Sequence, residues 1–168
     1  MQVALEPLTA EAFKPYGQVL NAPSNGTRED FVASVQNERS AARPNLALIG
    51  AKPGHFPLEI KALERHAYSN QAFLPLDVSD YLVVVCSDDG NGKPDLATLR
   101  AFRAGGHSGI NYNAGTWHYG MTTIGREGTF AMLVHEDGSG DDCHFVDVAP
   151  IMVVGDQRSS PKGLSQGC

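Results

Sequence analysis

The apolar residues of this chain occur in short runs that end at glycine, proline, aspartate or asparagine. The longest run, residues 81–86, reads Tyr-Leu-Val-Val-Val-Cys, and its aromatic and β-branched residues favour a buried strand. The 168 residues include 18 Gly and 10 Pro, which introduce turns and interrupt helices. Frequent turns between β-branched runs predict an all-β domain, either a sandwich or a barrel.

The same pattern predicts roughly nine to eleven short strands and one clear helix. Thr9 is a suitable N-cap for a helix that begins at Ala10. Residues 67–70 are expected to form a hairpin turn, and residues 155–168, which contain few apolar side chains, are expected to form a mobile tail. We expect strands at residues 3–5, 46–49, 58–66, 71–75, 81–86, 99–103, 109–118, 129–134 and 143–148.

The charge balance and the apolar content argue against several kinds of partner. The chain has 13 Lys and Arg against 19 Asp and Glu, a net charge of −6, whereas nucleic-acid binding requires clustered positive charge. A helix that spans a bilayer needs about 20 consecutive apolar residues, and no apolar run of this chain approaches that length. Residues 1–15 lack the apolar segment of a signal peptide. The 3 cysteines are widely spaced, without a Cys-x-x-Cys motif, as in reduced proteins. We therefore expect a cytoplasmic protein that binds neither nucleic acid nor membranes.

A first group of candidate functional residues lies at the end of the predicted strand 58–66. Side chains alternate along a strand, so Glu64 and His66 face one side and Arg65 faces the other. A hairpin turn after this strand would bring Gln71 back beside His66, with Phe73 two positions further along. This group could therefore gather a carboxylate, an imidazole and an amide on one face.

A second group lies in residues 109–118, where a strand, a glycine-containing turn and a polar aromatic segment follow one another. The candidates here are Asn111, Tyr112, Trp117 and His118. Each also has a simpler interpretation, because an isolated histidine is more often a structural residue than a ligand, and tryptophan more often belongs to a core.

Other polar residues have a structural interpretation that we prefer. Arg65 and Arg100 are expected to belong to surface ion pairs. The acidic pairs at residues 88–89 and 141–142 are expected to lie in solvated turns.

The spacing of the two groups matches a metal-binding cupin template. That template has His-x-His-x4-Glu in one segment and Pro-x-Gly-x-x-His in a later one. This chain has Glu64-x-His66-x4-Gln71 and then Asn113-x-Gly115-x-x-His118, so the spacing agrees although three residue types differ. His66, Gln71 and His118 are thus candidate ligands of a divalent metal, and two imidazoles suit nickel, zinc, iron or manganese without choosing among them. Because Gln71 is a neutral ligand, a site without metal is the alternative.

Five segments of the chain, taken in order, resemble the ureidoglycolate lyase family, formerly called ureidoglycolate hydrolase, which belongs to the cupins. They are residues 64–66, 71–75, 81–85, 94–102 and 109–118. The resemblance implies a cupin-type double-stranded β-helix barrel with one or two short helices, formed by residues 1–154 as a single domain. It also implies a homodimer and cleavage of (S)-ureidoglycolate to glyoxylate and urea in allantoin breakdown. For some members of the family, the resemblance also implies a requirement for nickel.

The roles that follow from the resemblance are those of an acid–base lyase that takes a small carboxylate. His66 and His118 would move protons, since imidazole titrates near neutral pH, and Glu64 would tune His66. Arg100 or Arg65 would bind the substrate carboxylate. The remaining contacts to the substrate are expected from Gln71, Phe73, Asn111, Tyr112 and Trp117.

The chain departs from the bacterial family pattern at three positions. Asn113, Tyr119 and Gly120 stand where a histidine, a second histidine and a proline are usual. The barrel and the group His66, Gln71 and His118 do not depend on these changes, but the substrate does not follow from the remaining pattern. A related cupin lyase or isomerase acting on another small hydroxy- or keto-carboxylate is therefore an alternative, as is a non-catalytic cupin that binds a small carboxylate.

Overall fold

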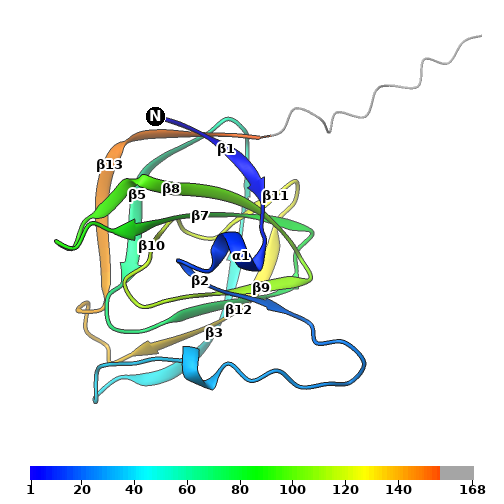
Figure 1. Ribbon diagram of the computed structural model, residues 1–168, viewed down its shortest axis with the longest axis vertical. Coiled ribbons are helices and arrows are strands. Elements are labelled where there is room, and N and C mark those ends of the chain that lie inside the picture. The colour runs from blue at the N-terminus through cyan, green and yellow to red at the C-terminus, as the bar shows by residue number, and fades with distance from the viewer. Residues whose placement is uncertain (156–168) are drawn as a thin grey trace, which may run out of the picture.

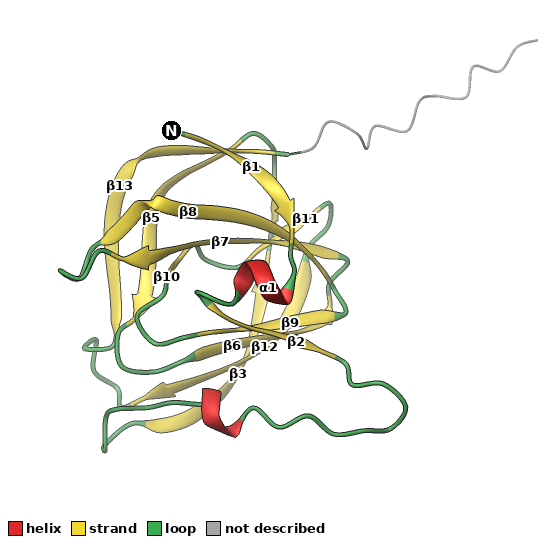
Figure 2. Cartoon of the chain, viewed as in Figure 1, coloured by secondary structure: helices red, strands yellow, loops and turns green. Residues whose placement is uncertain are grey.

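A computed structural model of the protein describes residues 1–155. These residues form an all-β barrel with one short α-helix and one 3₁₀ turn (Figures 1 and 2), which confirms the predicted fold class. No helix within this range has the length and apolar character needed to cross a membrane. The elements are, in order, β1 (Gln2–Pro7), α1 (Ala10–Phe13), β2 (Gly17–Asn21), η1 (Val32–Ser34), β3 (Arg43–Ala51), β4 (Pro53–Gly54), β5 (Leu58–His66), β6 (Gln71–Asp77), β7 (Asp80–Asp88), β8 (Pro94–Gly105), β9 (Ser108–Tyr112), β10 (Trp117–His118), β11 (Thr122–Ile124), β12 (Gly128–Glu136) and β13 (Cys143–Val154).

Local sequence signals place several of these elements correctly. β5 coincides with the predicted strand 58–66, and residues 81–86 form the buried centre of β7. Helix α1 begins after Thr9, whose side-chain oxygen accepts a hydrogen bond from the backbone N–H of Ala12. That bond satisfies one of the donors that a helix N-terminus leaves free.

The larger sheet closes on itself through its shortest strand. Its order is β10-β5-β13-β1-β8-β7-β11-β4, and β10 also pairs with β7. The first six strands therefore form a continuous ring, in which β1 runs parallel to both of its neighbours, β13 and β8. The smaller sheet has the order β2-β9-β6-β12-β3 and lies below the ring in Figure 1.

Strand β7 separates two apolar clusters by the alternation of its side chains. Leu82, Val84 and Cys86 belong to a cluster that draws residues from all six strands of the ring. The other face of β7 joins a second, aromatic-rich cluster between the two sheets. Members of this second cluster are Phe13, Tyr16, Phe73, Tyr81, Val83, Val85, Phe102, Ile110, Tyr112 and Phe130.

The predicted hairpin at residues 67–70 is wrong. β5 pairs with β13 and β10 in one sheet, whereas β6 pairs with β12 and β9 in the other. Ser69 and Asn70 are buried, and their hydrogen bonds and bridges run to residues 36–37, Asn111 and Asp142. The segment is therefore a crossing between sheets, held by long-range hydrogen bonds that no local pattern records.

The segment 109–118 likewise divides between the two sheets, with β9 in the smaller and β10 in the larger. Gly115 has a φ of 81° in the turn between them, a conformation that glycine adopts without steric cost. At the other end of the chain, β13 continues past Pro150 to Val154 because the register shifts between Asp147 and Ile151, and proline is tolerated at such irregularities. Except for Gly155, the predicted mobile tail lies outside the described residues.

Candidate active site

The two predicted groups meet at the point where β10 enters the ring. β10 lies between β5 and β7, and His118 stands opposite Glu64 on one side and Val85 on the other. His66 follows Glu64 by two positions on β5, so it shares the face of Glu64. The ring centroids of His66 and His118 are 6.3 Å apart, with 15° between the ring planes. The structure therefore brings both predicted histidines to one place.

His118 is held rigidly and is only 2% exposed. Its Nδ1 atom lies 3.0 Å from the carbonyl oxygen of Thr116, and since a carbonyl only accepts, Nδ1 carries a proton. Its ring stacks on Tyr112 at 4.2 Å between centroids. Nε2 lies 3.4 Å from Oε1 of Glu64 without a hydrogen-bond partner, so this nitrogen is the atom left for chemistry.

His66 is oriented from the opposite side by a carboxylate. Its Nδ1 atom lies 3.2 Å from Oδ2 of Asp142. Burial and the neighbouring His118 lower the pKa of His66, although Asp142 and Glu64 act in the other direction. His66 is therefore a neutral imidazole at neutral pH, and its Nε2 atom can accept a proton.

Asp142 lies in this site, although the sequence did not indicate it. The expectation of a solvated turn at residues 141–142 is wrong for this residue, which is 4% exposed. Oδ1 accepts a hydrogen bond from the backbone N–H of Tyr68, and Oδ2 accepts one from the hydroxyl of Ser69, both at 2.6 Å. Burial raises the pKa of Asp142, but these bonds and His66 outweigh it and leave the pKa low. Nothing in the local sequence distinguishes Asp142 from a loop aspartate, because its partners are about 75 residues away in sequence.

Glu64 is a partly buried carboxylate beside two imidazoles. Burial raises its pKa, but His118 and then His66 outweigh this effect, so that the pKa of Glu64 lies below its usual value. The site thus holds two ionised carboxylates, Glu64 beside both imidazoles and Asp142 beside His66.

Gln71 and Tyr112 complete the buried wall beside His118. They stand opposite each other in β6 and β9. The Oε1 atom of Gln71 and the hydroxyl of Tyr112 are buried without hydrogen-bond partners, as is Nε2 of His118. Unpartnered buried polar atoms are costly and uncommon, and a polar ligand bound at this wall could satisfy them.

Three other predicted contact residues lie elsewhere in the packing. Phe73 belongs to the aromatic cluster and meets the Tyr112 ring edge-on. The amide of Asn111 bonds to the side chains of Asn70 and Gln18 at 2.7 and 2.6 Å. Trp117 belongs to the core of the ring, the opposite face from His118.

Neither predicted arginine presents a free guanidinium to the histidines. Arg100 is paired with Glu6, at 2.6 Å from Nη2 to Oε2. Arg65 is paired with Asp88 and covers the Trp117 ring at 4.8 Å from its centroid. The predicted ion pairs are thus present, although Arg65 lies half-buried rather than on the surface.

The side chains do not fit the divalent metal that the sequence indicated. His66 and His118 each have Nδ1 engaged and Nε2 free, as metal-binding imidazoles do, but the other donors do not complete a set. Gln71 offers only a neutral amide oxygen where a carboxylate would complete the set, and its amide nitrogen faces Sδ of Met132 at 3.3 Å. No group of three or more His, Cys, Asp or Glu side chains in residues 1–155 is arranged to hold a metal ion.

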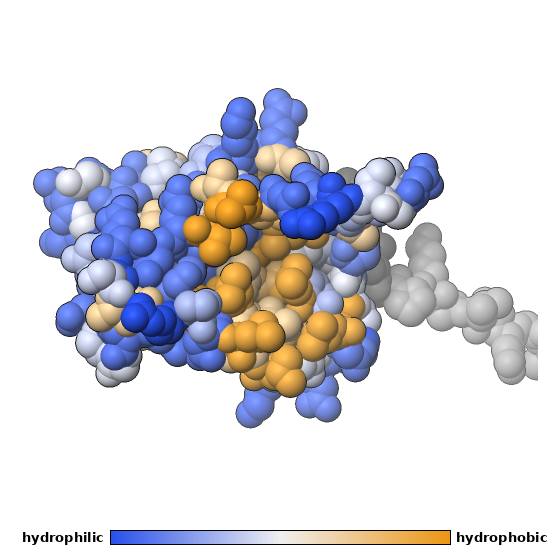
Figure 3. Space-filling view, turned by 90° about the horizontal axis from the view of Figure 1, so that it is seen from below, coloured by the Kyte–Doolittle hydropathy of each residue, from blue (hydrophilic) through white to orange (hydrophobic). Residues whose placement is uncertain are grey.

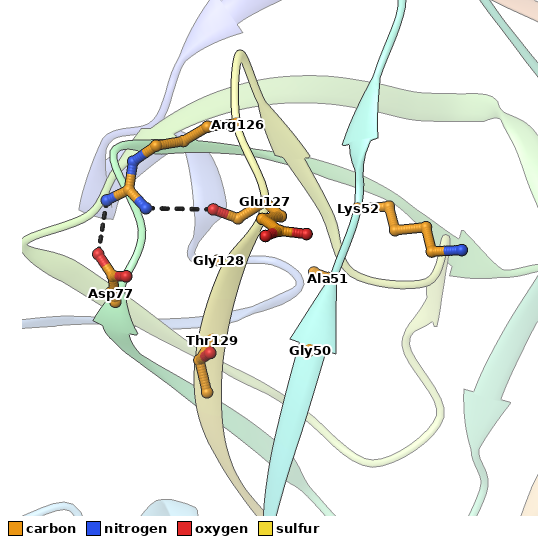
Figure 4. A pocket seen from close by; sticks show the side chains of 8 residues that line it. All are labelled: Gly50, Ala51, Lys52, Asp77, Arg126, Glu127, Gly128 and Thr129. Atoms are coloured by element: carbon orange, nitrogen blue, oxygen red, sulfur yellow. Dashed lines mark hydrogen bonds and ion pairs between the residues drawn. The ribbon is translucent and has the colours of Figure 1, made fainter.

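Two cavities differ in their relation to the histidines. A cavity of about 280 Å³ is lined by His66 and Asp142, together with Arg39, His135 and Cys143. Figure 4 shows a larger one, about 400 Å³, at the start of β12, and none of the predicted site residues lines it. Thr129 lines this second cavity, and Val134 of the same strand pairs with Gln71. The two residues are five positions apart, so about 16 Å of strand separates the cavity from Gln71. The second cavity is therefore remote from the imidazoles.

Comparison with known proteins identifies the same family as the five ordered segments of the sequence. The model of the family described as ureidoglycolate lyase matches residues 1–154. The chain belongs to the ureidoglycolate lyase family.

Curated relatives support this membership over most of their length. A putative ureidoglycolate lyase of Agrobacterium fabrum is 36% identical over 140 residues, covering 83% of this chain and 86% of the relative. A ureidoglycolate lyase of Brucella anthropi is 36% identical over 149 residues, with the same shares covered. A solved Bacillus subtilis oxalate decarboxylase is 20% identical with a TM-score of 0.38, and the match covers 86% of this chain but only 30% of that one. At that TM-score the likeness has no bearing on activity.

The ionisation of the site predicts that acid destabilises the fold in two stages. Because the pKa of His66 is lowered by folding, the unfolded chain binds this proton more tightly, and stability falls as the pH drops below the ordinary value of 6.5. The lowered pKa values of Glu64 and Asp142 contribute stability at neutral pH that is lost at lower pH, below about 4.5.

Calorimetric melting temperatures measured between about pH 7.5 and 4 test this prediction. We expect His66→Gln to flatten the first stage and to retain the second, whereas the exposed-residue control His55→Gln should follow the wild type. Equal pH dependence above about pH 5 in the wild type and in His66→Gln would contradict the ionisation described for His66.

Proposed function

We propose that this protein cleaves (S)-ureidoglycolate to glyoxylate and urea, as a lyase of allantoin breakdown. Family membership supports the substrate, and the observation that carries the proposal is the His66–His118 pair, 6.3 Å apart with each ring fixed through Nδ1. The substrate bears a hydroxyl group and a urea nitrogen on one carbon, next to a carboxylate. Its cleavage needs one group to remove the hydroxyl proton and another to protonate the departing nitrogen.

His66 is suited to the role of base. Its lowered pKa keeps it neutral, and Asp142 holds Nδ1 so that Nε2 offers its lone pair. As Nε2 takes the hydroxyl proton, the C–O bond becomes the aldehyde carbonyl of glyoxylate and the C–N electron pair passes to nitrogen.

His118 and Glu64 are suited to supply the second proton. Nε2 of His118 faces the Glu64 carboxylate at 3.4 Å, so the carboxylate lies beside the nitrogen that would carry the proton to the substrate. Transfer of that proton to the departing nitrogen releases urea. Exchange with solvent then returns the proton from His66 and restores His118, so no net proton is consumed.

The unpartnered polar atoms beside His118 would bind the polar groups of the substrate. Oε1 of Gln71 can accept a hydrogen bond from a urea N–H, and the hydroxyl of Tyr112 can donate one to an oxygen of the substrate. Among the predicted contact residues, these two are the ones that the geometry favours. A non-catalytic carboxylate-binding protein is less well supported, because it would not require two imidazoles that are each preset for proton transfer.

Loss of His118 should remove turnover, whereas loss of Asn113 should not. His118→Ala takes away an acid–base group, an effect of about 10²–10⁴-fold on kcat. Asn113 bonds to the side chain of Gln18 at 2.8 Å, and Asn113→Ala should retain most of the activity. Release of urea and glyoxylate from purified protein measures both variants, with circular dichroism as the check on folding. Equal losses in the two variants, or a normal rate in His118→Ala, would mean that the active site lies elsewhere.

The proposed chemistry requires no metal, so removal of metal should leave turnover intact. Nickel remains a prediction from the family resemblance. We expect elemental analysis of protein purified without chelator to find metal well below one ion per chain, and activity to survive treatment with EDTA. Loss of activity with EDTA and its return with nickel would replace this mechanism by a metal-dependent one.

We also propose that residues 1–154 act as one domain and that two copies form a homodimer in the cytoplasm. The smaller sheet supports the dimer by its outer face, where Leu46, Leu48, Leu74 and Leu76 are between 48% and 74% exposed. Register pairs link Leu48 to Ala131 and Ala131 to Leu74, so these residues share one face. Figure 3 shows apolar side chains gathered on this side of the molecule. An apolar face of this kind is typical of an interaction surface, and a two-fold axis would cover it on both copies.

Charge placed on this face should separate the copies. The double variant Leu46→Lys, Leu48→Lys is expected to be a monomer by light scattering at micromolar concentration, because buried lysines would repel across the axis. Phe145→Lys is the control, since Phe145 is equally exposed but lies on β13 in the other sheet. A wild-type monomer, or a dimer unaffected by the double variant, would contradict the proposed interface.

A further inference from the structure

We propose that Asp142 is a positioning residue that fixes His66 as the tautomer with its proton on Nδ1, so that Nε2 is the atom that accepts the substrate proton. The inference about the tautomer depends only on the geometry around Asp142. Its consequence for the reaction rate rests on the proposed function.

Every group around the Asp142 carboxylate is a donor. Oδ1 accepts from the backbone N–H of Tyr68 at 2.6 Å. Oδ2 accepts from the Ser69 hydroxyl at 2.6 Å and from Nη2 of Arg39 at 3.2 Å. The remaining neighbour of Oδ2 is Nδ1 of His66 at 3.2 Å. An ionised carboxylate has no proton to give, so the contact with His66 is a hydrogen bond only if Nδ1 carries the proton.

The carboxylate is also held in place from several directions. The backbone carbonyl of Asp142 accepts a hydrogen bond from the N–H of Ala67 at 2.9 Å. Arg39 reaches from Asp142 to Asp137, at 2.9 Å, and to the carbonyl oxygen of His135, at 2.7 Å. These contacts join the segment before β13 to the crossing after β5. The Asp142 side chain therefore cannot turn away from His66 without breaking its hydrogen bonds to Tyr68, Ser69 and Arg39.

The substitution Asp142→Asn would reverse the direction of the bond to His66. The backbone N–H of Tyr68 cannot move, so the amide oxygen should take the place of Oδ1. The amide nitrogen then occupies the place of Oδ2, next to Ser69, which can accept, and to Nδ1 of His66. Arg39 can withdraw, because it retains Asp137 and the carbonyl of His135. A donor at this place selects the His66 tautomer with its proton on Nε2, which cannot act as the base.

The test is nitrogen-15 NMR of the histidine rings together with steady-state kinetics. In the wild type we expect His66 to show the Nδ1–H tautomer at neutral pH. In Asp142→Asn we expect the Nε2–H tautomer, with kcat lower by about 10²–10⁴-fold and a smaller change in KM. Ser69→Ala is the matched control, because it removes a donor to the same oxygen and presents none to His66. That variant should keep the wild-type tautomer and lose less than about 10-fold in kcat.

The outcomes separate this inference from the proposed function. An Nε2–H tautomer in the wild type, or an unchanged tautomer in folded Asp142→Asn, overturns the positioning role even if the protein cleaves ureidoglycolate. Absence of cleavage by the wild type overturns the proposed function but leaves the tautomer result standing. If Asp142→Asn does not fold, the wild-type tautomer and the Ser69→Ala variant still decide the question.

Discussion

The candidate site depends on the two-sided pairing of β10, a strand of only two residues (Trp117–His118). Its hydrogen bonds to β5 and β7 close six strands into a ring. The same bonds send the two side chains of β10 to opposite faces. Trp117 enters the core of the ring, and His118 is placed opposite Glu64. Trp117, which packs in the core of the ring, is therefore the chain neighbour of His118, which faces the site. A change that disturbs β10 would affect both the stability of the fold and the chemistry of the site.

The two imidazoles have different surroundings, which suit the different roles proposed for them. His66 is buried beside another histidine, and this environment favours the neutral ring. His118 has the Glu64 carboxylate 3.4 Å from its free nitrogen, on the side of the ring that the proposed mechanism uses. Two imidazoles in different surroundings are an arrangement that suits a base and an acid acting on one substrate. Both roles depend on carboxylates held nearby, one from β5 and one from the segment before β13.

Local rules in the sequence predicted the parts of this site that lie on one strand. Alternation placed Glu64 and His66 on one face and Arg65 on the other, and spacing selected His118. The failures concern contacts between distant segments. The hairpin at residues 67–70 was wrong because buried Ser69 and Asn70 bond to segments far away in sequence. Asp142 was missed for the same reason, since its burial is decided by the crossing after β5 and by Arg39, neither of which leaves a local pattern.

In the proposed reaction, the substrate lies between His66 and His118. Titration of the isotope-labelled protein with the product glyoxylate, followed by NMR of the histidine rings and backbone amides, tests it most directly. We expect saturable shifts of the His66 and His118 ring signals, with those of exposed His55 unchanged. Shifts confined to the cavity of Figure 4, around Lys52 and Gly128, with both imidazoles unaffected, would contradict it.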